Sequence, residues 1–148
     1  MERKPKLTYS NYDRETGISY AFVAGRYGEF LGKSRLDPAD KEFESKYAGC
    51  EYAEIRANIS YMKEKLKIAR VKLKTMQDYY NIIKGMNGFN EKSVEAKKAR
   101  YLIFQYNDEI ETLKNQIKLS QNKLKDKIVF RDKILKEVKR KKNMVKNE

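Results

Sequence analysis

The feature that most constrains this chain is a heptad pattern of apolar residues between positions 55 and 83. Apolar side chains recur there at alternating steps of four and three residues: Ile55, Ile59, Met62, Leu66, Ala69, Leu73, Met76, Tyr80 and Ile83. This spacing places them along one face of an α-helix and is typical of the seam between two coiled helices. The chain is therefore expected to form a long helix that packs against a partner helix.

A second seam follows at the same spacing. Its members are Ala96, Ala99, Ile103, Tyr106, Ile110, Leu113, Ile117, Ser120 and Leu124. Between the seams, residues 85–88 (Gly-Met-Asn-Gly) supply the positive φ angles that end a helix and reverse the chain. Asn90 is the predicted N-cap of the second helix. Two seams joined by a short loop predict an antiparallel helical hairpin, and residues 125–148 either pack beside the N-terminal region or project as a basic arm.

The N-terminal region has a different pattern. Short aromatic and β-branched runs at 7–9, 18–24 and 30–31 are separated by Gly and Asp, which predicts a small β-meander of about three strands. So small a sheet is marginal alone and should lie against a helix. Tyr61, Ile68 and Tyr79 form a second apolar row on the first helix and are the predicted docking site. Asp37 followed by Pro38 predicts the start of that helix.

The predicted fold class is therefore α+β and predominantly helical. A β-meander at residues 1–36 is expected to pack on a long basic αα-hairpin at residues 37–148, which ends in a C-terminal basic extension. Charged residues make up 37% of the chain and hydrophobic residues 40%, a balance that suits a thin core. The formal net charge is +13, which favours binding to polyanions.

The positive charge is concentrated in two helical segments. Residues 61–74 hold five Lys and one Arg against one Glu, and residues 123–148 hold nine Lys and two Arg against four acids. In the first segment, four cations at i, i+4, i+7 and i+11 form what we call the basic stripe: Lys63, Lys67, Arg70 and Lys74. In the second, we define the C-terminal basic cluster as Lys133, Lys136, Lys139, Arg140, Lys141 and Lys142.

A row of cations on a helix can follow a phosphate backbone. The basic stripe and the C-terminal basic cluster are therefore the predicted nucleic-acid contacts. A second interpretation is a solvated helix face, since Lys is a strong helix former.

Tyrosines in the N-terminal region also allow two interpretations. Tyr9, Tyr12, Tyr20 and Tyr27 lie among basic residues at positions 4, 6, 14 and 26. Exposed tyrosines on a sheet can stack nucleotide bases. Tyrosine is equally a favoured strand residue whose ring covers a small core.

Two other functions remain open. The chain could be an adaptor or inhibitor, of the phage or mobile-element type, that binds a larger nucleic-acid-handling protein such as a defence nuclease. The β-meander would then supply the specific contacts through Tyr20, Tyr27 and Phe30. The helices could also form a homodimer by assembling into a four-helix bundle through the second apolar row.

No catalytic or metal-binding pattern is found, so a non-enzymatic protein without a cofactor or metal is predicted. Histidine, the commonest general base and metal ligand, is absent. The glycines at 25, 28 and 32 precede Lys33-Ser34 without the spacing of a phosphate-binding loop. A single cysteine, Cys50, cannot form an intrachain disulfide. The apolar runs are too short for a membrane span and no secretory signal opens the chain, so a cytoplasmic location without membrane binding is expected.

Overall fold

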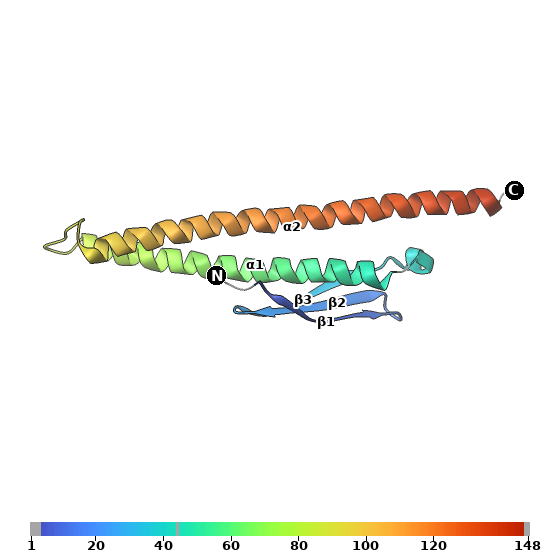
Figure 1. Cartoon of the computed structure of the whole chain (residues 1–148), viewed down its shortest axis with the longest axis horizontal. Helices are drawn as coiled ribbons and strands as arrows, with labels where there is room; N and C mark the ends of the chain where they lie inside the picture. The colour runs from blue at the N-terminus through green and yellow to red at the C-terminus, as the bar shows by residue number, and fades with distance from the viewer. Residues whose placement is uncertain (1–3, 44, 147–148) are drawn as a thin grey trace. The chain divides into compact units, whose positions relative to one another are not determined.

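A computed structural model of the chain describes residues 4–43 and 45–146. In chain order, the elements are β1 (Lys6–Asp13), β2 (Ile18–Gly25), β3 (Gly28–Arg35), the 3₁₀ helix η1 (Pro38–Phe43), α1 (Lys46–Lys84) and α2 (Val94–Lys146) (Figure 1). The predicted α+β class is confirmed: a three-stranded sheet precedes two long helices, and 68% of the chain is helical. Neither α1 nor α2, within these residues, contains a stretch that is long and apolar enough to cross a membrane.

The chain divides into two compact units, and both long helices run through both of them. We call them the sheet unit, residues 1–61 with 118–148, and the hairpin unit, residues 62–117.

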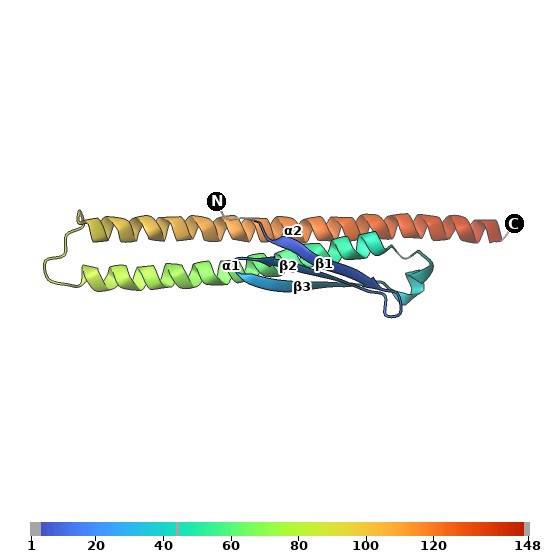
Figure 2. The same ribbon diagram turned by 60° about the horizontal axis from the view of Figure 1, so that its bottom comes forward.

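In the sheet unit, the three strands form an antiparallel sheet in the order β1-β2-β3 (Figure 2). Gly28 has a φ of 119° in the tight turn between β2 and β3, a conformation that favours glycine. Alternate residues of β2 (Ser19, Ala21 and Val23) are fully buried, which places one face of the sheet in the core. Val23 forms a buried cluster with Ala57 and Tyr61 of α1, so the sheet covers α1 as expected.

Small residues allow the sheet to lie very close to α1. A Cβ atom built on Gly32 would lie 1.8 Å from the carbonyl oxygen of Ala53, and one built on Gly49 would lie 2.1 Å from Ser19 Oγ. The docking face of α1 is therefore Ala53, Ala57 and Tyr61, at i, i+4 and i+8.

Of the predicted docking row, Tyr61 packs in the buried cluster with Val23, Ile68 is half-buried and Tyr79 is 44% exposed. The prediction did not include Ala53 and Ala57, which the sheet approaches most closely. Strand and helix backbones can approach this closely only where side chains are small.

Two predicted helix starts also need correction. Asp37 begins only η1, where Asp40 N donates to Asp37 O at 2.8 Å. The cap of α1 is Ser45, whose Oγ accepts a hydrogen bond from Ala48 N at 3.2 Å. Asn90 closes a local turn with Lys92 N at 3.0 Å, and Ser93 caps α2 by accepting from Ala96 N at 3.2 Å. Asp and Asn favour turns, and here the Asp37 carbonyl and the Asn90 side chain accept hydrogen bonds within a turn that precedes each helix.

In the hairpin unit, α1 and α2 lie side by side and antiparallel next to their connecting loop (Figures 1 and 2). The predicted seam is confirmed, because its residues in this unit are all buried or half-buried. The buried members are Leu66, Ala69, Ala96, Ala99, Ile110, Leu113 and Ile117. Arg100 anchors the loop by donating to Glu91 O at 2.7 Å and to the Tyr80 hydroxyl at 3.3 Å.

Candidate nucleic-acid interface

The basic stripe lies on α1 in the hairpin unit, and all four of its side chains are exposed. From Lys63 to Lys74 it extends about 16 Å along the helix, at a rise of 1.5 Å per residue. It is turned by about a third of a helical turn from the buried seam residues Leu66 and Ala69. Within the described part of the chain, no ion pair engages any of these four cations. The stripe therefore presents its full charge to solvent.

The C-terminal basic cluster lies on α2 in the sheet unit, and part of its charge is already engaged. Lys139 is half-buried and pairs with Asp40 of η1. Arg140 donates to Glu137 at 2.7 Å, and this hydrogen bond lowers the pKa of the Glu137 carboxyl. Lys133, Lys136 and Lys141 are exposed, and Lys142 is exposed but takes part in a further interaction. The cluster is thus less available to an external anion than the basic stripe.

Ion pairs also show where the last part of α2 lies. Lys127 pairs with Glu51 of α1, and Lys139 pairs with Asp40 of η1. The hydrogen bond to Glu51 raises the pKa of Lys127. Of the two alternatives for residues 125–148, these ion pairs favour packing beside the N-terminal region as far as Lys139.

The predicted protein-contact residues are distributed over both faces of the sheet. Tyr27 and Phe30 pack against Tyr61, with ring centroids 5.9 and 5.8 Å from that ring. Tyr20 lies on the opposite face, where Lys33 Nζ is 5.8 Å from its ring centroid. The structure therefore separates Tyr20 from the other two, which help to hold the sheet on α1.

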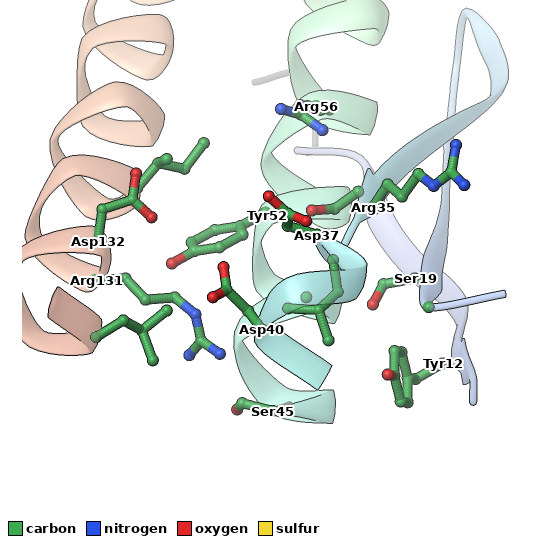
Figure 3. A pocket seen from close by; sticks show the side chains of 16 residues that line it. Tyr12, Ser19, Arg35, Asp37, Asp40, Ser45, Tyr52, Arg56, Arg131 and Asp132 are labelled. Carbon is green, nitrogen blue, oxygen red and sulfur yellow. The ribbon is translucent and has the colours of Figure 1, made fainter. Parts of the chain in front are cut away.

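A cavity of about 350 Å³ lies inside the sheet unit (Figure 3). Its charged lining consists of three arginines and three aspartates: Arg35, Arg56, Arg131, Asp37, Asp40 and Asp132. Arg131 and Tyr52 reach into this space from α2 and α1, and Asp40 points toward it from η1. Because the Arg35 side chain points away from this space (Figure 3), the three aspartates outnumber the other two arginines, and the cavity has no net attraction for a polyanion. We interpret it as a polar contact region where α2, η1, α1 and the sheet meet, and we call it the polar joint.

Sequence reasoning did not identify this joint. The one available signal was Arg131, a charged residue that occupies a seam position between Ile128 and Leu135. Arg35 and Arg56 gave no signal, because only folding brings β3 and α1 together. Among the described residues, no group of acidic or cysteine side chains is arranged to hold a metal ion.

Tyr52 in this joint makes the stability of the fold sensitive to alkaline pH. Burial raises the pKa of its hydroxyl above the ordinary 10.0, and the nearby Arg131 partly offsets that rise. The folded protein therefore keeps this proton to higher pH than the unfolded chain does. Its stabilising contribution is full below about pH 10 and is lost as pH rises through the folded pKa. Lys127, whose pKa is also raised, contributes with the same sign.

We expect the free energy of unfolding to fall as pH rises above about 10, and to fall less steeply in Tyr52→Phe. Urea denaturation of both proteins between pH 8 and 11, followed by circular dichroism, measures this difference. An identical alkaline decline in the two proteins would assign the effect to other groups.

Comparison of the chain with protein-family models, with curated proteins and with solved structures finds no match. Function is therefore argued from the charge and geometry of the described residues.

Proposed function

We propose that this protein binds nucleic acid without catalysing a reaction, and that the basic stripe of α1 supplies the main phosphate contacts. The observation that carries this proposal is the exposure of Lys63, Lys67, Arg70 and Lys74 along one helix face, where no ion pair with another described residue reduces their charge. Exposed members of the C-terminal basic cluster supply further contacts.

The dimensions of the stripe suit a phosphate backbone. One strand of a duplex carries a phosphate about every 3.4 Å of helix axis, so a stripe about 16 Å long faces roughly five of them. Each neutralised phosphate releases condensed counterions, which makes binding strong at low salt and steeply dependent on salt concentration. Phosphate contacts of this kind carry no sequence preference.

Charge reversal of the stripe tests the proposal. We expect Lys63→Glu/Lys67→Glu/Arg70→Glu/Lys74→Glu to lose at least about 100-fold in affinity at 50 mM salt, because four attractions become repulsions. The slope of log affinity against log salt should become flatter by about three to four. Fluorescence anisotropy with labelled single- and double-stranded DNA and RNA, between 50 and 200 mM salt, measures both quantities.

A matched control reverses four exposed lysines elsewhere in the hairpin unit: Lys84, Lys92, Lys97 and Lys98. This variant has the same net charge, so a general charge effect would weaken binding equally in both. Equal losses would contradict a localised interface, as would wild-type affinity that disappears by about 150 mM salt.

An exposed apolar row on α1 favours a second candidate function. Val71 and Ile82 are 60% and 61% exposed and lie on the same helix face as Tyr79. Such a row fits an adaptor or inhibitor, of the phage or mobile-element type, that docks on a larger nucleic-acid-handling protein. In that case free nucleic acid binds weakly, and Val71→Ser/Ile82→Ser abolishes partner binding but leaves the anisotropy unchanged, because it adds no charge beside the basic stripe. A homodimer through the same row would instead show a mass that depends on concentration.

A further inference from the structure

We infer that the outer face of the three-stranded sheet stacks the bases of a single-stranded nucleic acid. This inference rests on the proposed function only for the choice of nucleic acid as ligand. Its own basis is a set of aromatic rings and cations that folding gathers on the face of the sheet opposite to α1.

Strand alternation defines that outer face. Ser19, Ala21 and Val23 are buried toward α1, so Tyr20 and Phe22 project from the other side. The strand register then assembles two rows across the sheet. One row is Asn11, Tyr20 and Lys33, and the next is Tyr9, Phe22 and Leu31.

The Tyr9 ring is the accessible ring of these rows. Tyr9 is 55% exposed, whereas Tyr20 and Phe22 are half-buried. The Tyr9 and Phe22 rings form a tilted pair with centroids 6.2 Å apart. An exposed ring on a sheet offers a flat face on which a base can stack, and every base has a face suited to such stacking.

The charges around the rings favour a polyanion by a small excess. Lys33 Nζ lies over the Tyr20 ring at 5.8 Å from its centroid. The strand register places Lys6 and Arg35 on the same face, together with the acids Asp13 and Glu29, so the cations outnumber the acids by three to two. In Figure 3 the Arg35 side chain points away from the cavity of the sheet unit. Cations that flank stacked rings are the combination that holds bases and phosphates together in single-strand binding proteins.

A duplex cannot use this surface in the same way, because its bases are stacked on one another and their faces are covered. The sheet should therefore discriminate between single and double strands, whereas the basic stripe binds both.

Tyr9→Ser is the test variant, because it removes an exposed ring and leaves the buried face of the sheet unchanged. We expect about a 10-fold loss of affinity for a labelled oligothymidylate at 150 mM salt and no change for a duplex of equal length. Tyr9→Trp should restore or increase the single-strand affinity. The matched control is Tyr101→Ser on α2, a tyrosine of similar exposure at 59%, which should change neither affinity.

Photocrosslinking gives a second measurement that does not depend on a variant. An oligonucleotide containing 5-iodouridine should crosslink to Tyr9, Tyr20 or Phe22 of the wild-type protein, as located by mass spectrometry. Crosslinks confined to other residues would overturn the inference, as would equal losses by Tyr9→Ser on single and double strands.

The outcomes separate this inference from the proposed function. If the stripe variant loses binding and Tyr9→Ser does not, the sheet proposal is wrong and the proposed function stands. If Tyr9→Ser loses single-strand binding and the stripe variant does not, the sheet alone is the binding site. If the wild-type protein binds no nucleic acid, both proposals are wrong.

Discussion

Gly32→Ala is expected to destabilise the protein by about 3 kcal/mol or more, since it forces the sheet away from α1. The added Cβ would lie 1.8 Å from Ala53 O and 2.6 Å from Ala57 N. Both atoms belong to the α1 backbone and cannot rotate out of the way. The usual gain from replacing a strand glycine by alanine, about 0.5–1 kcal/mol, is far smaller than this clash.

Urea denaturation followed by circular dichroism measures the loss, and the near-ultraviolet signal reports whether the aromatic side chains as a group keep their packing. Gly85→Ala is the matched control, because its Cβ would have only ordinary contacts at 3.7 Å. We expect this control to change the free energy of unfolding by less than about 0.5 kcal/mol. An unchanged denaturation midpoint in Gly32→Ala would show that the sheet does not sit on α1 at Ala53.

Leu113→Ala is expected to cost about 2–5 kcal/mol, because it leaves a cavity in the hairpin seam. Leu113 is 3% exposed and belongs to the same heptad seam as Ile110 and Ile117. A thin core has few neighbours that can move in to fill the space, so the loss should lie in the upper half of that range.

Leu119→Ala provides the matched comparison on the same helix, because Leu119 is 68% exposed. The same deletion there should cost less than about 0.5 kcal/mol. Thermal and urea unfolding of the two variants give the difference directly. Equal effects would contradict the assignment of the seam, since burial is the only relevant difference between the two leucines.

The sequence by itself determined the helical hairpin. Its heptad seam repeats one face every seven residues, and a helix that exposed that face to water would be unstable. The glycine-rich loop at 85–88 and the glycine-punctuated strands of residues 6–35 are equally local signals. Spacing within one helix also placed the basic stripe on a single exposed face. Such features depend on residues close in sequence, and helical or strand geometry fixes their relation before any tertiary contact forms.

The tertiary structure decided which way the tyrosines face and which cations remain available. Tyr20 projects outward and Tyr27 packs on Tyr61, although both belong to the same aromatic-rich segment. Their directions depend on which face of the sheet packs on α1. Gly32 lies on that face, at a point where a side chain would clash with the carbonyl oxygen of Ala53. The sequence likewise assigned Lys139 to the C-terminal basic cluster, but in the folded chain Lys139 forms an ion pair with Asp40 of η1. These outcomes depend on close approach between distant segments, which local spacing does not encode.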